Sequence, residues 1–437
     1  MPTTTSLRPL ALGDLHTSLS DPALTSMTLL NEIAGRFPAA VSFAAGRPYE
    51  GFLDPDSLQR QIGVFRRHLE TDLGQGPDQV RRTLFQYGRT KGTISHLVAR
   101  HLEVDEGLHV DPESVVVTTG CQEAMVLVLR ALRRDERDVV LAPAPTYVGF
   151  IGAARLVDMR VCPVLEGPDG VDPEDLVRQI RAARAEGLRP RACYVVPDFA
   201  NPGGMSMPLE RRREVLRIAE EEDILLLEDN PYSMFRASGS RPPTIKSMDA
   251  HRRVVYLGSF AKSAFAGARV GYAVADQPVE GGSGAGMLAD ELAKLKSMLT
   301  LNTSTVAQAV IGGFLLEHGC SVERAVGREA AVYRENLRVV LSELAARFPG
   351  ASAAERGGVE WNVPDGGMFV VLTVPFRADE EALEVSAERF GVLWTPMYHF
   401  YGGAGGFRQM RLSFSVLTTA AINEGLDRLA AFVAHRK

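Results

Sequence analysis

Hydrophobic residues in the middle of the chain gather into short continuous runs, and stretches with helical periodicity separate these runs. The runs are rich in valine, isoleucine and leucine, and they lie at residues 114–118, 138–141, 159–164, 193–196, 224–227, 254–257 and 270–274. Strands that are buried on both faces have this continuous apolar pattern, and helices between them give parallel crossover connections. The pattern therefore predicts an α/β fold with a mainly parallel sheet that helices cover on both faces.

The pattern changes after about residue 276. Gly281–Gly286 is predicted to be a surface insertion, and a long helical region with a break at Gly319 follows from Met287 to Phe348. The C-terminal part mixes short strands with helices and ends in an amphipathic helix over residues 420–433. We therefore predict an N-terminal segment that joins the small domain, a large domain and a small α+β domain, over residues 1–60, 61–325 and 326–437.

Composition narrows the class of protein. The 437 residues are 45% hydrophobic and 23% charged, with a formal net charge of −6, which is typical of a soluble globular protein. The acidic balance and the lack of a long basic run argue against nucleic acid as the main partner, and no apolar run is long enough to span a membrane. No secretory signal is evident, so we expect a cytoplasmic protein. Its four cysteines fit neither a disulfide framework nor a zinc site, because they are far apart: Cys121, Cys162, Cys193 and Cys320.

A lysine between a predicted strand and a glycine-containing loop carries the strongest chemical signal. Lys262 has a hydroxyl residue, Ser259, three positions before it and Arg269 seven positions after it. A lysine in such a place is commonly a solvated surface residue. Together, however, these residues supply what an aldehyde cofactor with a phosphate needs: an amine for a Schiff base, and a hydroxyl and a guanidinium for the phosphate.

Polar residues also follow two other predicted strands. Asp229 closes the strand at 224–227 and could simply cap a helix, but a carboxylate there could also keep a pyridine nitrogen protonated. Tyr232 and Asn201 could donate hydrogen bonds to the phenolic oxygen of the same ring, although Asn201-Pro202-Gly203 is by itself a common turn.

These motifs occur in one order along nearly the whole chain, together with Gly120-Cys121-Gln122 after the first strand of the large domain and a late Arg411-Leu412-Ser413-Phe414. In this order they resemble the fold-type I pyridoxal 5′-phosphate (PLP) enzymes, specifically class I/II aminotransferases of the 2-aminoadipate/MocR-like branch. The resemblance implies PLP as cofactor and amino-group transfer between an amino acid and a 2-oxo acid. It also implies a mainly parallel seven-stranded sheet in a large PLP-binding domain, plus a smaller α+β domain.

The resemblance further implies a role for each matching residue around the ring. Lys262 would carry the Schiff base and shuttle the proton, and Asp229 would pair with the pyridine nitrogen. Asn201 and Tyr232 would hold the ring oxygen. Tyr147, in Pro145-Thr146-Tyr147, would stack on the ring.

For the phosphate, the resemblance implies Ser259 and Arg269, helped by backbone amides at a helix N-terminus from Gly120, Cys121 and Gln122. Tyr87 matches a tyrosine that family members lend to the phosphate of the neighbouring subunit. This correspondence implies a homodimer with shared active sites, and the segment 301–304 lies where relatives also reach the partner's cofactor.

On the substrate side, Arg411 matches the arginine that clamps the α-carboxylate of the amino acid, and Gly46 and Arg47 stand at the expected substrate mouth. Arg47 replaces an apolar residue there, and the other departures from the family pattern are Cys121 for serine, Ala266 for proline, and Arg89 and Lys91 for proline and an acid. The basic residues could be solvated or interfacial, or could shape the substrate pocket.

Short stretches at Ser26–Glu50 and Tyr87–Gly92 look similar to hydroxyphenylglycine and dihydroxyphenylglycine aminotransferases, which supply arylglycines to peptide antibiotics. A competing hypothesis is a PLP enzyme of the same fold that performs β- or γ-replacement, carbon–carbon bond formation or amino-acid oxidation. A MocR-type regulator needs a winged-helix domain, whereas only about 25 residues precede the helix predicted at Met27–Leu30. An enzyme is therefore expected.

Overall fold

The computed structural model describes residues 10–21, 24, 26, 32–281, 286–402 and 405–436. The helix predicted at Met27–Leu30 and most of the glycine-rich stretch at 281–286 lie outside these residues.

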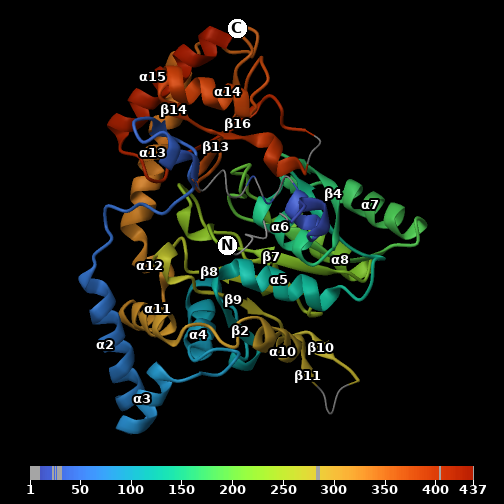
Figure 1. The fold of residues 1–437 in the computed structure, drawn as a ribbon, viewed down its shortest axis with the longest axis vertical. Helices are drawn as coiled ribbons and strands as arrows, with labels where there is room; N and C mark the ends of the chain where they lie inside the picture. Colours follow the sequence, from blue (N-terminus) through green and yellow to red (C-terminus); the bar gives the residue numbers. More distant parts are fainter. Residues whose placement is uncertain are drawn as a thin grey trace, which may run out of the picture.

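A central sheet dominates the structure (Figure 1). Its eight strands lie in the order β2-β9-β8-β7-β6-β3-β4-β5. Their bounds are Val115–Thr118 (β2), Asp138–Ala144 (β3), Arg160–Gly167 (β4), Gly170–Val171 (β5), Arg189–Val195 (β6), Leu225–Asp229 (β7), Val254–Ser259 (β8) and Gly271–Val274 (β9). The strands from β4 to β8 along this order pair in parallel, and β9 runs antiparallel between β8 and β2.

The mainly parallel sheet is confirmed, and it has one strand more than the predicted seven. The additional strand is the two-residue β5, which pairs antiparallel with the end of β4. A two-residue turn connects these strands, and so short a connection can join only antiparallel neighbours. Two residues are too few to leave a recognisable apolar run in the sequence.

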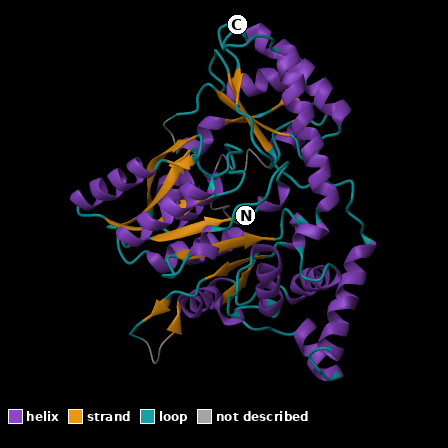
Figure 2. Cartoon of the chain, turned by 180° about the vertical axis from the view of Figure 1, so that it is seen from behind, coloured by secondary structure: helices purple, strands orange, loops and turns teal. Residues whose placement is uncertain are grey.

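Helices cover both faces of this sheet (Figure 2). On one face the buried side chains of the strands pack against α5, α6 and α10, and on the other against α7, α8 and α9. The bounds are Gly120–Leu132 (α5), Val148–Leu156 (α6), Pro173–Ala185 (α7), Leu209–Glu221 (α8), Ile245–Met248 (α9) and Leu288–Leu299 (α10). Val139 and Val140 face opposite clusters, which explains why the strands are apolar without alternation.

The long helical region divides into α10, α11 (Thr305–Glu317), α12 (Val322–Ala325) and α13 (Gly327–Arg347). The break predicted at Gly319 is confirmed. A second break at residues 300–304 was not predicted; Leu301 is left-handed there, and Ser304 caps α11 by accepting from the Ala307 N–H. Tertiary contacts hold this break, because the Thr303 hydroxyl donates to the Val117 carbonyl.

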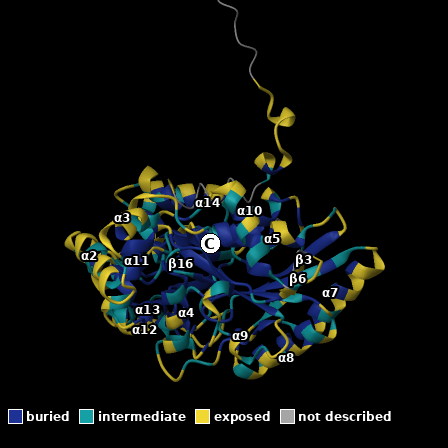
Figure 3. Cartoon of the chain, turned by 90° about the horizontal axis from the view of Figure 1, so that it is seen from below, coloured by how far each residue is buried: buried dark blue, intermediate teal, exposed yellow. Residues whose placement is uncertain are grey.

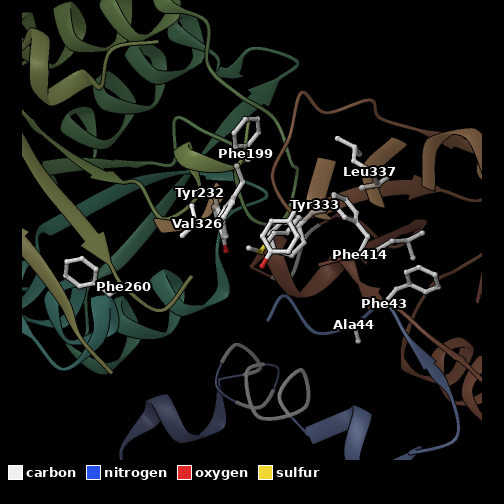
Figure 4. Packing of buried hydrophobic residues seen from close by; sticks show 14 of the residues in the cluster. Phe43, Ala44, Phe199, Tyr232, Phe260, Val326, Tyr333, Leu337 and Phe414 are labelled. Carbon is white, nitrogen blue, oxygen red and sulfur yellow. The ribbon is translucent and has the colours of Figure 1, made fainter. Parts of the chain in front are cut away.

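The C-terminal part is a smaller α+β unit with a four-stranded sheet in the order β12-β13-β16-β15. Its elements are β12 (Glu360–Trp361), β13 (Phe369–Thr373), α14 (Glu380–Val385), β14 (Val392–Leu393), β15 (Thr395–Pro396), β16 (Gln409–Ser413) and α15 (Thr419–Arg436). α13 packs against α15. Buried side chains from both parts of the chain, among them Tyr232 and Tyr333, lie in one cluster (Figure 4).

The N-terminal segment contacts both parts of the molecule. Strand β1 (Val41–Ser42) pairs in parallel with β14, whereas α2 (Asp56–Thr71) packs against α11. The three-part division stays a prediction, and α2 runs across its boundary at residue 60. The remaining helices are α3 (Pro77–Phe85) and α4 (Ser95–Glu106), and the outward faces of α2, α7 and α8 carry exposed residues (Figure 3). Within the described ranges, no helix has the length and apolar character to cross a bilayer.

Candidate active site

A cavity of about 600 Å³ lies where the carboxyl ends of β7 and β8 meet the first turn of α5. Ligands in α/β proteins bind at this edge of a parallel sheet. Nine residues predicted from the sequence line this one cavity: Cys121, Gln122, Tyr147, Asn201, Asp229, Tyr232, Ser259, Lys262 and Arg269. A larger hollow of about 1050 Å³ lies at the amino ends of β6 and β7, and none of the predicted site residues line it.

Lys262 follows β8 and is half-buried. Its Nζ donates to the Gly46 carbonyl at 2.6 Å, so the N-terminal segment reaches the amine. Burial, together with the positive charges of Arg411 and Arg269, lowers the pKa of Lys262 to about 8. A substantial part of this amine is therefore neutral, and nucleophilic, only slightly above neutral pH.

Asp229 ends β7 and is buried. One carboxylate oxygen, Oδ2, accepts from the Tyr194 hydroxyl at 2.7 Å, and the Cys121 thiol lies 3.6 Å from Oδ1. Burial raises the pKa of Asp229 more than the hydrogen bonds from Tyr194 and Cys121 lower it, and the net result is a pKa of about 6. The carboxyl group is therefore mostly ionised at pH 7, as a partner for a pyridinium must be.

Tyr194 is a site residue that the sequence analysis missed. It lies within the apolar run of β6 and lines the cavity. A buried tyrosine hydroxyl needs a hydrogen-bond partner, so a tyrosine inside such a run was the available signal. The sequence did not show where its partner would be.

The residues expected at the ring oxygen also lie together. Tyr232 is buried and hydrogen-bonds Asn201, whose Oδ1 accepts from Nη1 of Arg411 at 2.5 Å. Tyr147 precedes α6 on the cavity wall, and burial raises the pKa values of both tyrosines well above their usual range. Both hydroxyls therefore stay protonated and can donate hydrogen bonds.

The phosphate end has the form of an anion cradle. α5 begins at Gly120, whose φ is +72°, and a Cβ there would lie 2.5 Å from Nη2 of Arg269. A Cβ at Gly271 would lie 2.5 Å from the Cys121 nitrogen. Glycine therefore lets the backbone, the first helical turn and an arginine come close together, and helix N-termini favour anions.

The arginine expected to bind the substrate carboxylate comes from the small sheet. Arg411 lies on β16, which pairs with β13 on one side and β15 on the other. It is buried, its Nη2 donates to the Ala44 carbonyl at 2.8 Å, and the rings of Phe369 and Phe400 lie 4.6 and 5.0 Å from its guanidinium carbon. Burial lowers the pKa of Arg411 to about 10, so it stays charged at neutral pH. Its Nε is buried and has no hydrogen-bond partner among the described residues.

The glycine at the expected substrate mouth is tightly enclosed. A Cβ at Gly46 would lie 2.8 Å from the Phe369 ring, so a larger residue cannot be accommodated without movement. At Arg47, the main-chain carbonyl accepts from the Ser415 hydroxyl.

Gly46, Arg47, Gly120 and Arg411 are not among the residues that line the cavity, and neither are Tyr87, Arg89 and Lys91. Tyr87 is 81% exposed and is not among the lining residues. Arg89 pairs with Glu113 at 2.8 Å, and Lys91 pairs with Asp290 at 2.6 Å. These ion pairs give Arg89 and Lys91 a structural explanation.

The chemistry of this donor set fits PLP. An amine of lowered pKa, an ionised buried carboxylate and an anion cradle face one cavity, and they match the aldehyde, the pyridine nitrogen and the phosphate. Cys121, which replaces the serine of the family pattern, places its thiol near Asp229.

The fold and this site define a fold-type I PLP enzyme, and the chain belongs to the aminotransferase class I and II family, whose model matches residues 72–429. It is a PLP-dependent aminotransferase. It is 54% identical to the (S)-3,5-dihydroxyphenylglycine transaminase of Amycolatopsis orientalis, over 98% of this chain and 95% of that one. It is 31% identical to the 2-aminoadipate transaminase of Thermus thermophilus, over 90% of this chain and 89% of that one.

Among solved structures, a kynurenine aminotransferase of Pyrococcus horikoshii in complex with PMP has a TM-score of 0.78 and 26% identity, over 93% of this chain and 94% of that one. The resemblance inferred from the motifs is thus confirmed at the level of the family. The hypothesis of a replacement, bond-forming or oxidation reaction is not favoured, because these relatives are aminotransferases.

Proposed function

We propose that this aminotransferase interconverts an arylglycine and the matching aryl-glyoxylate, and so supplies an arylglycine for peptide antibiotic biosynthesis. The observation that supports it best is the 54% identity, over nearly both full lengths, to (S)-3,5-dihydroxyphenylglycine transaminase. We propose an aromatic amino acid such as tyrosine as the amino donor. The cavity walls include the aromatic and apolar side chains of Tyr147, Val148 and Met125, which suit an aryl group.

Residues of this chain would bind both the phosphate and the ring of PLP. Arg269, Ser259 and the N–H groups at the start of α5 would bind the phosphate. Asp229 would pair with the ring nitrogen, and Asn201 and Tyr232 would donate to the ring oxygen. When bound, PLP supplies an electron sink for the negative charge left at Cα after the proton leaves.

Two residues act on the amino acid itself. Arg411 would bind the α-carboxylate through its planar guanidinium, because this group is buried and charged and its Nη1 lies 2.5 Å from Oδ1 of Asn201 on the cavity wall. Lys262 would accept the proton from Cα of the amino acid and release it again later in the reaction. Its lowered pKa lets the amine accept and release a proton near neutral pH.

We also propose a homodimer in which Tyr87 and the segment 301–304 complete the partner's site. These two segments are neighbours, because the Thr305 hydroxyl donates to the Leu84 carbonyl at the end of α3. Around them, large apolar side chains are exposed: Phe85, Tyr87, Met298, Leu299, Leu301 and Val306. Exposed apolar groups clustered in this way are typical of a protein interface. A cytoplasmic location is proposed from the four free cysteines.

The substrate proposal is tested by incubating the purified PLP-loaded enzyme with single amino acids and a 2-oxo acid. We expect arylglycines such as 3,5-dihydroxyphenylglycine to yield the aryl-glyoxylate, identified by mass, and Lys262→Ala to yield none. If arylglycines and aromatic amino acids do not react while another class does, the substrate proposal is wrong and the aminotransferase assignment stands.

A further inference from the structure

We propose that Tyr194 is a positioning residue that holds the Asp229 carboxylate in place for the pyridine nitrogen of the cofactor. This inference rests on the proposed function, in which Asp229 pairs with that nitrogen. Tyr194 itself would act only through Asp229.

The register of the sheet brings the two side chains together. β6 and β7 are parallel neighbours in which Tyr194 lies opposite Leu227, and Asp229 is two residues further along β7. Residues two apart on a strand share a face, so Tyr194, Leu227 and Asp229 point to the same side of the sheet. The long tyrosine side chain spans the remaining offset, and its hydroxyl donates to Oδ2 at 2.7 Å.

The ring of Tyr194 cannot move away from this contact easily. Tyr194 is fully buried, and its ring stacks on Phe150 of α6 with centroids 4.0 Å apart and planes 13° from parallel. A hydrogen bond whose donor is held by packing gives direction as well as charge stabilisation to its acceptor. Asp229 is therefore held between β6 and the Cys121 thiol of α5.

The same contact affects the charge of Asp229. Burial raises the pKa of Asp229 to about 6, and the hydrogen bond from Tyr194 is the largest influence that opposes this rise. The other ionisable groups around the carboxylate are Cys121 on α5, Tyr147 before α6 and Tyr232 after β7, and the cations Lys262 and Arg269 line the same cavity.

Removing the Tyr194 hydroxyl should therefore raise the pH at which Asp229 loses its charge. A hydrogen bond to a charged group corresponds to about a tenfold change or more in an equilibrium constant. For the Asp229 carboxyl group this is a shift of roughly one pH unit in the midpoint of its titration. At pH 7 a larger share of Asp229 would then be neutral, and the cofactor nitrogen would lose its counter-charge.

The test compares wild type with Tyr194→Phe, which keeps the ring and its stacking on Phe150. PLP affinity of the apoenzyme is measured across pH, and the protonation of the ring nitrogen is followed by NMR with nitrogen-15-labelled PLP. We expect Tyr194→Phe to raise the midpoint of the pH dependence of PLP affinity by roughly one pH unit, and so to weaken PLP binding about twofold at pH 7, where only about half of Asp229 would remain ionised. The matched control is Tyr333→Phe, which removes a buried hydroxyl bonded to the Tyr49 N–H, and it should change neither quantity.

A double-mutant cycle with Asp229→Asn separates positioning from a general loss of structure. If Tyr194 acts through Asp229, adding Tyr194→Phe to Asp229→Asn should cost little further affinity. Additive losses, or a Tyr194→Phe profile identical to wild type, would overturn the proposal.

The outcomes also distinguish this inference from the proposed function. If the ring nitrogen of PLP is protonated to the same extent in Asp229→Asn, with Tyr194 intact, as in wild type, the role proposed for Asp229 is wrong. If Tyr194→Phe does not fold, Phe150→Leu replaces it, since it releases the ring and should raise the same midpoint by a smaller amount; no shift would count against the proposal.

Discussion

At the scale of single residues, burial sets the charge of the groups that face the cavity. It lowers the pKa of Lys262 to about 8 and that of Arg411 to about 10, and it raises the pKa of Asp229 to about 6. At neutral pH, Arg411 is therefore charged, Asp229 mostly ionised, and Lys262 more readily neutral than a solvated lysine. These are the states needed to bind a carboxylate, pair with a pyridinium and exchange a proton.

The pKa of Lys262 predicts how cofactor capture depends on pH. Only the neutral amine attacks an aldehyde, so the rate at which the apoenzyme takes up PLP should rise about tenfold per pH unit below pH 8 and level off above it. Stopped-flow absorbance measures this rate. Arg411→Gln removes a positive charge that lowers the pKa of Lys262, so its profile should lie at higher pH; a rate independent of pH would contradict the assignment.

Arg411 predicts a second effect at this scale. Arg411→Lys keeps the charge but loses the planar fork and its contacts with the rings of Phe369 and Phe400, so kcat/KM should fall about 10- to 100-fold. Steady-state kinetics with the amino acid measures the loss. PLP affinity in the absence of substrate serves as the control and should remain near wild type.

At the scale of elements, the ends of strands and the start of one helix supply the chemistry. β7 ends at Asp229, β8 leads to Lys262, and α5 begins where Gly120 lets Arg269 approach. The break between α10 and α11 is another element end that places residues of the proposed function, because it exposes Leu301 and its neighbours at the surface.

Gly120→Ala tests the start of α5. Alanine is strained at a φ of +72°, and its Cβ would displace Arg269, so PLP affinity should fall at least about tenfold. Titration of the apoenzyme with PLP measures this. The control is Gly327→Ala at the start of α13, where an added Cβ meets nothing within 4 Å; there affinity and stability should change little. Equal effects of the two variants would argue against a phosphate cradle.

At the scale of the whole molecule, segments from both ends of the chain contact residues that line the cavity. The N-terminal segment brings Gly46 to Lys262 and Ala44 to Arg411, and the C-terminal sheet brings Arg411 to Asn201. In the proposed homodimer, the exposed Tyr87 would contribute to the cavity of a second copy of the chain, because it is not among the residues that line the cavity of its own chain.

Mixing inactive chains tests the shared sites. A Tyr87→Phe chain and a Lys262→Ala chain should each have low activity, and hybrid dimers should regain activity because one of their sites receives both intact residues. Activity is assayed after the subunits are exchanged, and sedimentation gives the oligomeric state. A monomer in solution, or hybrids no more active than the parents, would exclude the proposed sharing.

Local patterns were enough to predict much of this molecule. Continuous apolar runs predicted the buried strands because burial on both faces leaves no polar alternation, and Asp229 and Lys262 could be assigned because each follows such a strand. The ordered motifs then predicted the family, the cofactor and nine residues that line one cavity.

Other features depend on contacts between segments far apart in sequence, and only the tertiary structure decided them. The partner of the Tyr194 hydroxyl is set by the pairing of β6 with β7, the bonds of Arg411 by the docking of the small sheet, and the break at 300–304 by a bond to Val117. The two-residue β5 is likewise defined by its pairing with β4. Sequence periodicity records which face of an element is buried, whereas the identity of what buries it is a property of the folded chain.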